Sequence, residues 1–497
     1  MSVTRRDFIR FSALGLGGAF LAACGVPATA AATVPPSPVG RTPTPTGTTL
    51  KSKDQKASAT PAAVNPLFLA APILGRPTDT SVAANLVPAV AMTVFYEYGT
   101  ASGSYTGRSA AQAAAAGVPL ETSINGLLPA TRYYYRPNVD GAAGAEASFV
   151  TRRGPGSSFT FCLQGDSHPE RLNKEFSPQL YPLTLQQAAA DQPDFYLTIG
   201  DDFSVDRLKS VDADTVKALY LNQRAWLGQV GAPVFLVNGN HEQASLANLN
   251  GTADDVAVWA QTARNSLYPQ PAPDAFYAGD PDPVAFIGPL RDYYAWTWGD
   301  ALFVVLDQYW HSPVTVDNPF GADHDPKGGR DLWQVTIGDA QYRWFQQTLA
   351  ASTAKYKFVF SHHVLGTQRG GIELAGECEW GDAANLAAHR PGWDRTIHQL
   401  MADHGVTIYF QGHDHIFVHQ ELDGVVYQTL PQPADPNYAL NNAAAYRSGD
   451  KLPNSGYMRV SVAPAGVTVD YVRTWLPQDV PTGHTSGEVA YTYTISA

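Results

Sequence analysis

The sequence predicts an α/β protein in which two mixed β-sheets are flanked by helices, preceded by a small all-β sandwich. First, continuous apolar runs alternate with helix-like segments from residue 158 onward, which is typical of strands buried on both faces. Second, residues 67–152 hold short alternating runs separated by Gly and Pro turns. Third, 497 residues are too many for one hydrophobic core, so two or three domains are expected.

The composition is that of a globular protein, and it argues against some partners. Hydrophobic residues make up 44% of the chain and charged residues 16%, which is too apolar for a mainly disordered protein. The net charge is −12 without a basic block in the globular region, which argues against a nucleic-acid-binding surface. The three cysteines, at positions 24, 162 and 378, suggest no disulfide framework.

Residues 1–24 are expected to be an export signal. The pair Arg5-Arg6 precedes an uncharged run at residues 11–23, which is too short to span a membrane. The pair resembles a twin-arginine signal, and Leu-Ala-Ala-Cys-Gly at residues 21–25 resembles a bacterial lipobox. The resemblance implies lipid attachment at Cys24 and an exported lipoprotein, anchored to a membrane at the cell surface or in the periplasm. An ordinary signal peptide with an incidental cysteine is the alternative.

Two further segments flank the predicted domains. Residues 25–66 are rich in Pro, Thr, Ala and Ser and lack aromatic residues, so they are expected to be an extended linker. Residues 476–497 are expected to be a C-terminal tail.

Residues 67–152 are expected to form the small β-sandwich, without catalytic residues. The sequence Gly-Leu-Leu-Pro-Ala-Thr-Arg-Tyr-Tyr-Tyr at residues 126–135 resembles the corner of a fibronectin type III-like domain. By that resemblance its tyrosines are core and corner residues rather than a surface for a ligand.

The domain at residues 157–475 is expected to carry the chemistry, because polar motifs follow its strand-like runs. In open α/β sheets, polar residues just past the carboxyl ends of strands line the binding crevice. Five such motifs occur, in this order: Asp166-Ser167-His168, Gly200-Asp201-Asp202, Gly239-Asn240-His241-Glu242, Ser361-His362-His363 and Gln411-Gly412-His413-Asp414-His415. A single motif of this kind is more often a turn or a satisfied polar group, but five in one domain indicate a shared site.

Helices and hairpins are expected between these motifs. Helices are predicted near residues 183–190, 213–227, 339–351 and 393–402. Hairpins are predicted at residues 293–306, 416–427 and 458–472. Ordered loops that rim the site and select the substrate are predicted at residues 243–292, 309–337, 366–392 and 432–456.

These residue types suit a pair of metal ions. Two divalent ions roughly 3.5–4 Å apart need a bridging carboxylate, with nitrogen and oxygen ligands on either side. Asp, His and Asn supply such ligands, and each stands at the end of a strand, where a rigid scaffold can hold it. Such a pair activates water and neutralises phosphoryl charge during displacement.

The ordered set Asp-x-His, Gly-Asp, Gly-Asn-His-Glu, His and Gly-His-x-His resembles the calcineurin-like metallophosphoesterase family. The resemblance implies a four-layer fold, two metal ions (Mn, Fe or Zn), and hydrolysis of a small-molecule, lipid or nucleotide phosphoester. It also implies three ligands for each ion and one bridging ligand: Asp166, His168 and His415; Asn240, His362 and His413; and Asp201. By the same resemblance, His241 is not a ligand but stabilises the transition state and can protonate the leaving oxygen.

Position 204 departs from the family's pattern. The family has an aspartate there that orients the catalytic histidine, whereas this chain has Ser204. Asp202, Asp206 or Glu242 is expected to take over that role.

The next motif offers two histidines for one ligand position. His362 is preferred to His363 because it falls where the family has its single histidine.

Two alternative functions remain open. One is a purple acid phosphatase-like phosphomonoesterase, a branch that shares the fibronectin-like front domain but uses a tyrosine ligand after the second motif. Phe203 and Ser204 stand there in this chain, which argues against a tyrosinate-iron site. The other is a non-catalytic surface binding protein that recognises its partner through the β-sandwich. The sequence does not distinguish phosphomonoesters from phosphodiesters as substrates.

Overall fold

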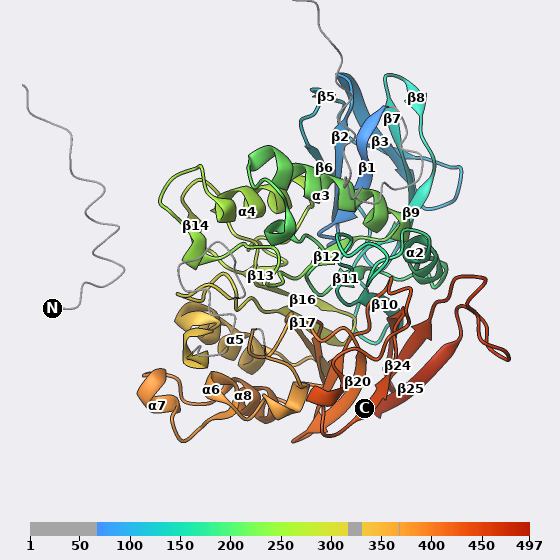
Figure 1. The fold of residues 1–497 in the computed structure, drawn as a ribbon. Coiled ribbons are helices and arrows are strands. Elements are labelled where there is room, and N and C mark those ends of the chain that lie inside the picture. The colour runs from blue at the N-terminus through green and yellow to red at the C-terminus, as the bar shows by residue number, and fades with distance from the viewer. Residues whose placement is uncertain (1–66, 317–330, 367) are drawn as a thin grey trace, which may run out of the picture. The chain divides into compact units, whose positions relative to one another are not determined.

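The computed structural model describes residues 67–316, 331–366 and 368–497 (Figure 1). The predicted export signal with Cys24, and the linker at residues 25–66, lie outside the described residues. All described residues belong to one compact unit, Ala57–Ala497. Within this described part of the chain, no helix combines the length and the apolar character needed to cross a membrane.

Residues 68–150 form two small antiparallel sheets, which confirms the predicted all-β region. The strands are β1 (Phe68–Gly75), β2 (Ser81–Pro88), β3 (Met92–Gly99), β4 (Gly107–Arg108), β5 (Gln112–Ala114), β6 (Leu120–Asn125), β7 (Arg132–Val139), β8 (Ala142–Ala143) and β9 (Ala147–Val150). One sheet has the order β1-β2-β6, and the other is built on β3 and β7. The Tyr133 hydroxyl accepts the backbone N–H of Leu128 at 2.9 Å, a contact typical of a tyrosine corner. The likeness to fibronectin type III domains stays a prediction.

The first sheet of the larger domain has six strands in the order β12-β11-β10-β23-β24-β25. Its strands and associated helices are β10 (Phe159–Gln164), α2 (Leu180–Ala190), β11 (Tyr196–Thr198), α3 (Ala213–Leu227), β12 (Val234–Leu236), α4 (Val256–Leu267), β23 (Gly456–Ala463), β24 (Gly466–Arg473) and β25 (Val489–Ser496). Strands β10, β11 and β12 are parallel neighbours. Their carboxyl ends therefore meet at one edge of the sheet.

The second sheet has eight strands in the order β13-β16-β17-β18-β19-β21-β20-β22. Its strands and associated helices are β13 (Ala278–Gly279), β16 (Tyr294–Trp298), β17 (Ala301–Val305), α5 (Gly338–Ala351), β18 (Tyr356–Phe360), α6 (Cys378–Gly381), α7 (Leu386–His389), α8 (Ile397–Asp403), β19 (Ile408–Gln411), β20 (Phe417–Leu422), β21 (Val425–Thr429) and β22 (Asp450–Leu452). Strands β17, β18 and β19 are parallel. Strands β14 (Pro283–Val284) and β15 (Gly288–Pro289) form a separate hairpin.

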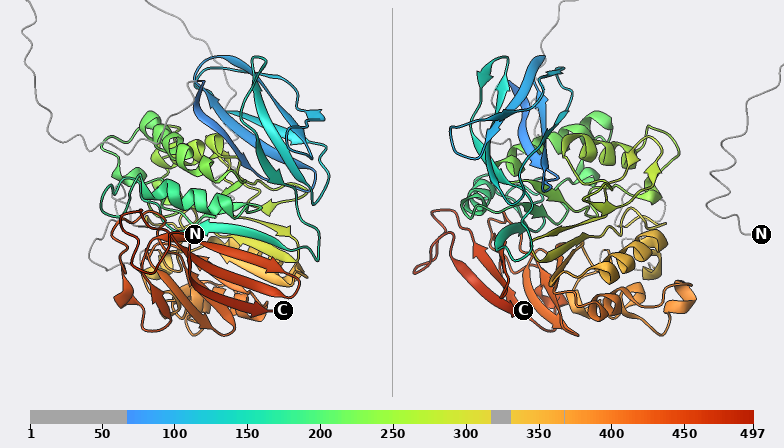
Figure 2. Two further views of the ribbon diagram at one scale, coloured as in Figure 1. Left: turned by 90° about the vertical axis from the view of Figure 1, so that its right-hand side faces the viewer. Right: turned by 180° about the vertical axis from the view of Figure 1, so that it is seen from behind.

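The two sheets pack face to face, and helices cover their outer faces (Figure 2). Phe161, Trp296 and Phe410 lie in the apolar core between the sheets. Tyr220 of α3 belongs to the core under the helices of the first sheet, and Phe345 of α5 to the core under those of the second. This order of helices, sheet, sheet and helices confirms the predicted four-layer fold.

Regular structure that was not predicted from the sequence includes a long helix and a sheet strand. Residues 243–292 include helix α4, which begins where the Asp255 side chain accepts the backbone N–H of Ala257. Residues 476–497 include β25, which pairs antiparallel with β24. The sheet therefore extends beyond residue 475. Exposed and half-buried side chains alternate along β25, which gives the strand one half-buried face.

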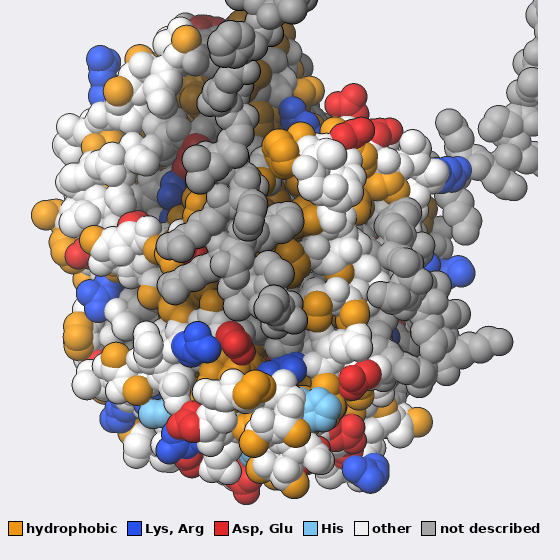
Figure 3. Space-filling view, turned by 90° about the vertical axis from the view of Figure 1, so that its left-hand side faces the viewer, with side chains coloured by type: hydrophobic (Ala, Val, Ile, Leu, Met, Phe, Trp, Pro, Cys, Tyr) orange, Lys and Arg blue, Asp and Glu red, His pale blue; other side chains and the backbone are white. Residues whose placement is uncertain are grey.

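Charged side chains are interspersed on the face shown in Figure 3. Among the described residues visible there, Lys and Arg side chains stand apart from one another, between acidic and apolar side chains. A nucleic-acid backbone binds to a continuous basic stripe. The predicted lack of a nucleic-acid partner still rests on the net charge of −12.

Candidate metal centre

The structure brings all seven predicted ligand residues together at adjoining edges of the two sheets. Each stands within a few residues of a strand's carboxyl end: Asp166 and His168 follow β10, Asp201 follows β11, Asn240 follows β12, His362 follows β18, and His413 and His415 follow β19. All seven side chains are buried. Their ionisable members fall into two groups with the spacing of a metal site, and a third such group joins His168 and Asp201 to His241. Their role as ligands remains a prediction.

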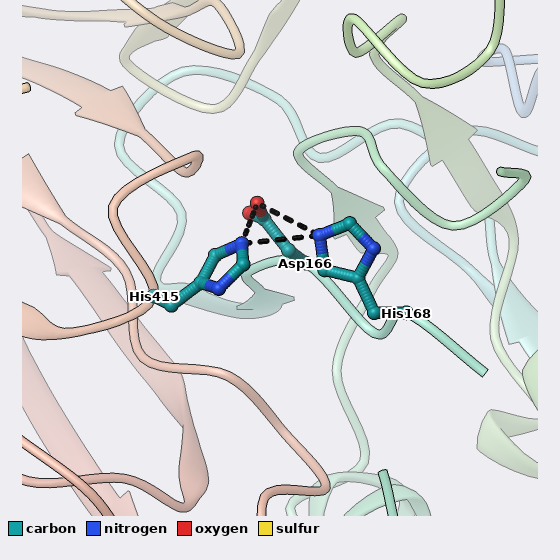
Figure 4. Close-up of side chains that lie close together, drawn as sticks. All are labelled: Asp166, His168 and His415. Atoms are coloured by element: carbon teal, nitrogen blue, oxygen red, sulfur yellow. Dashed lines mark hydrogen bonds and ion pairs between the residues drawn. The ribbon is translucent and has the colours of Figure 1, made fainter. Parts of the chain in front are cut away.

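The first set of donors is Asp166, His168 and His415 (Figure 4). His415 Nε2 lies 3.0 Å from Asp166 Oδ2, and His168 Nε2 lies 3.0 Å from His415 Nε2. Burial opposes the charge of Asp166, but His362 and His415 outweigh it and lower its pKa to about 2. The carboxylate is therefore ionised and faces two ring nitrogens.

The second set of donors is Asn240, His362 and His413. Asn240 Oδ1 lies 3.1 Å from His362 Nε2 and 3.0 Å from His413 Nδ1. The two ring nitrogens are 3.3 Å apart. One oxygen and two nitrogens thus converge, which is a donor set suited to Zn, Mn or Fe.

Asp201 stands between the two sets. Its Oδ2 lies 3.6 Å from His168 Nε2 of the first set and 3.2 Å from His362 Nε2 of the second. This oxygen is buried and makes no hydrogen bond to any described residue. Its position fits the predicted bridging role.

Carboxylates and a carbonyl behind the histidines orient their rings. Glu170 Oε1 lies 2.9 Å from His168 Nδ1, and Glu175 Oε2 lies 2.9 Å from His415 Nδ1. His362 Nδ1 donates to the carbonyl of Ile199 at 2.8 Å. Because an acceptor holds the proton on each Nδ1, each Nε2 is the nitrogen that can offer a lone pair to a metal ion.

Sequence analysis missed Glu170 and Glu175. A glutamate two residues after His168 is a weak signal, but nothing in the sequence links Glu175 to His415 across 240 residues. Burial opposes ionisation of both glutamates, yet His168 and His415 respectively help to lower their pKa values. Charged acceptors of this kind increase the basicity of the histidine nitrogens that face the centre.

The backbone is strained where the ligands stand. His168, Asp201, His413 and His415 all have positive φ angles, from 44° to 64°. Side chains other than glycine adopt this left-handed region at an energetic cost, and such strain clusters at functional sites. At Gly412 a Cβ atom would lie 2.3 Å from Asp166 Oδ1, so the chain passes too close to this carboxylate for any side chain.

His241 lies beside the centre, and Asp206 orients it. Its Nδ1 is 2.8 Å from Asp206 Oδ1, and its Nε2 is 3.8 Å from Asp201 Oδ2. Burial lowers the pKa of His241, but the charge of Asp201 and the hydrogen bond to Asp206 raise it to about 9. His241 is therefore protonated at neutral pH and holds a proton on Nε2 at the edge of the centre.

The other two candidates for orienting His241 have different contacts. Glu242 accepts backbone N–H groups of Asp202, Phe203 and Gly239, at 2.7–3.1 Å, and so joins two ligand loops. Asp202 accepts the side-chain amide of Gln164 at 3.0 Å. Burial raises the pKa of Asp202 to about 7.

The ring of His363 packs beside that of His413, with centroids 4.7 Å apart, but its nitrogens contact other groups. Its Nδ1 accepts the backbone N–H of Leu365 at 3.1 Å, and its Nε2 lies 3.6 Å from Asp414 Oδ1. The structure thus places His362, rather than its neighbour, among the candidate ligands.

The purple acid phosphatase alternative needs a tyrosine ligand after the second motif, where this chain has Phe203 and Ser204. Phe203 packs in the core, where its ring stacks on Tyr220 with centroids 4.0 Å apart. Tyr309 is buried with its ring 5.7 Å from that of His362, and its hydroxyl has no hydrogen-bond partner among the described residues. Sequence analysis did not single out Tyr309.

A further group with metal-like spacing lies apart from these motifs. It consists of Asp280, Asp292 and His311. His311 Nε2 lies 2.7 Å from Asp292 Oδ2, so this histidine is paired within the group.

Comparison with known proteins agrees with the fold described above. The family description "Calcineurin-like phosphoesterase" matches residues 159–417. A solved structure of PhoD is 16% identical and covers 87% of this chain and 92% of its own, with a TM-score of 0.60. GAP50 from Plasmodium, an anchor in the inner membrane complex, is 14% identical, covers 68% and 89%, and has a TM-score of 0.37. No curated protein matches the chain. The similarity to PhoD supports the fold.

Proposed function

Because the chain belongs to the calcineurin-like phosphoesterase family, we propose that it is an exported hydrolase that cleaves phosphoester bonds with two metal ions. The substrates are small-molecule, lipid or nucleotide phosphoesters. The family supports hydrolysis of phosphoesters, and the contacts of the site support the metal dependence.

One observation carries the metal dependence. His168 Nε2 and His415 Nε2 face each other at 3.0 Å, while acceptors hold the proton of each ring on Nδ1. Two ring nitrogens at this separation need a proton or a metal ion between them, because two bare lone pairs repel. Asp166 adds a carboxylate oxygen 3.0 Å from His415 Nε2, so the donors fit a metal ion.

The same reasoning gives each side chain a role. Asp166, His168 and His415 would hold one ion, and Asn240, His362 and His413 the other. Bound metal ions lower the pKa of water to supply a nucleophile at neutral pH, and they offset phosphoryl charge. Asp201 would keep the two ions at a fixed separation.

His241 would supply the proton that the leaving oxygen needs. Its Nδ1 is held by Asp206, so only Nε2 is directed toward the reacting phosphoester. A positioned acid of this kind contributes roughly 10²- to 10⁴-fold to the rate.

The first test uses the purified protein freed of metal and then loaded separately with Mn, Fe or Zn. Phosphomonoesters and phosphodiesters are offered to each form, because the geometry does not choose between them. We expect no turnover without metal and turnover of at least one ester class with one of the metals. Equal hydrolysis by the metal-free protein would refute the metal dependence. A visible tyrosinate-to-iron band would favour the purple acid phosphatase alternative.

Export and lipid anchoring are supported by the N-terminal sequence alone. In a bacterial host with twin-arginine and lipoprotein export, the full chain should fractionate with membranes, and Cys24→Ser should be exported without a lipid. Substitution of Arg5 and Arg6 by Lys should leave the protein in the cytoplasm. Cytoplasmic full-length protein in such a host would contradict the proposal, and membrane association of Cys24→Ser would contradict the anchor.

A further inference from the structure

Arg171 lies beside the catalytic histidine and has no role in the proposed mechanism. Its Nη2 is 3.4 Å from His241 Nε2, the nitrogen to which the proposed function assigns protonation of the leaving oxygen. The Arg171 side chain is 25% exposed, so solvent and substrate can reach it. It stands in the loop that follows the first motif, three residues after His168.

The position of Arg171 is fixed by the same glutamates that orient the metal ligands. Its Nη1 donates to Glu175 Oε2 at 2.7 Å, and its Nε lies 3.4 Å from Glu170 Oε1. Those oxygens also contact His415 and His168. The guanidinium is therefore held in a constant place relative to the centre.

This arrangement leaves one side of the guanidinium directed toward the reacting group. A guanidinium stays charged at every physiological pH and offers several N–H donors in a plane, which suits phosphoryl oxygens. The two glutamates occupy Nη1 and Nε, so Nη2 remains beside His241 Nε2. Both donors then point to the same small region next to Asp201.

We propose that Arg171 binds a non-bridging oxygen of the substrate's phosphoryl group while His241 serves the leaving oxygen. The inference rests on the proposed function, because it assigns a phosphoryl group to this site. Any phosphoester would make this charged contact, and so would the inorganic phosphate that is released from monoesters.

A second arginine, Arg369, lies against the ligand loop of the fifth motif. Its Nη1 donates to the carbonyl of His413 and lies 3.3 Å from Asp414 Oδ1. These contacts lie at His413 and Asp414, whereas Arg171 lies beside His241, which makes Arg171 the better candidate.

The test compares Arg171→Ala and Arg171→Lys with Arg136→Ala in the metal-loaded full-length protein. Arg136 is a matched control, because it is 32% exposed and forms a 2.7 Å ion pair with Glu97 in the all-β region. Phosphate binding is measured by calorimetry, and turnover of the best ester from the metal screen by steady-state kinetics. Metal content is measured for every variant.

For Arg171→Ala we expect the Kd for inorganic phosphate and the KM to rise about 10-fold or more, the effect of losing a hydrogen bond to a charged group. Metal content stays unchanged and kcat falls less than KM rises. Arg171→Lys recovers part of the phosphate affinity because it keeps the charge. Arg136→Ala behaves as the wild type.

Three results would overturn the inference: unchanged phosphate affinity in Arg171→Ala, loss of metal in both Arg171 variants, or a shifted alkaline limb of the rate profile with unchanged affinity. Loss of metal would mean that Arg171 holds the glutamates that orient the ligands. A shifted alkaline limb would mean that Arg171 changes the pKa of His241. Failure of the proposed function is a different result, in which the metal-loaded wild type hydrolyses no ester. Calorimetry with phosphate still decides the role of Arg171 in that case.

Discussion

Asp201→Asn is expected to abolish metal binding and phosphoester hydrolysis together. Asp201 Oδ2 is buried between the two donor sets, 3.6 Å from His168 Nε2 and 3.2 Å from His362 Nε2. An amide keeps the shape of the side chain but removes the negative charge that a bridge between two cations needs. We expect metal affinity to fall by more than the ~10- to 100-fold that loss of an outer hydrogen-bond partner costs. Elemental analysis and turnover should decline in parallel.

Asp194→Asn is the matched control for Asp201→Asn. Asp194 is also a buried aspartate and precedes strand β11, which Asp201 follows. It contacts Arg153 at 2.8 Å and Trp298 Nε1 at 2.9 Å, far along the strand from the donor sets. This variant should unfold at a lower temperature but keep its metal. Full activity and metal content in Asp201→Asn would rule out the bridging role.

His241→Ala should keep both metal ions but lose turnover by ~10²-fold or more, the scale of a lost general acid. His241 Nδ1 is occupied by Asp206, and Nε2 is 3.8 Å from Asp201 Oδ2. The three donors of each set remain in place without it. His398→Ala, which removes a buried histidine bonded to Tyr427 at 3.0 Å, controls for the loss of a buried ring. Loss of metal in His241→Ala would show that His241 is a ligand.

Asp206→Asn tests the same histidine through its pKa. Burial lowers the pKa of His241, whereas the charge of Asp201 and the hydrogen bond that His241 donates to Asp206 raise it to about 9. The acid form is active below that pKa, so a lower pKa moves the alkaline limb of the kcat profile to lower pH. Metal content should not change. An alkaline limb at the wild-type position would mean that Asp206 does not set the protonation of His241.

The sequence by itself determined the fold class and the identity of the candidate ligands. Continuous apolar runs followed by Asp, Asn or His mark strands whose carboxyl ends meet at one edge, and this pattern requires no knowledge of the loops. The order of the motifs then carried the resemblance to the family, which the match to residues 159–417 confirms. Strand β25 was missed because an edge strand with one half-buried face has a weak apolar pattern.

Only the tertiary structure decided which neighbouring side chain takes each role. His362 and His363 are adjacent, and one faces Asn240 while the other faces Leu365 and Asp414. Side chains of successive residues point to opposite sides of an extended chain, and the register of a strand end is set by its packing.

The partners behind the ligands depend on tertiary structure even more strongly. Asp206 reaches His241 because the loop after Asp201 forms a short turn of 3₁₀ helix, Val205–Arg207. Glu175 reaches His415 across the interface between distant segments. Sequence spacing predicts where a strand ends, but the path of the following loop depends on long-range contacts that have no local signal.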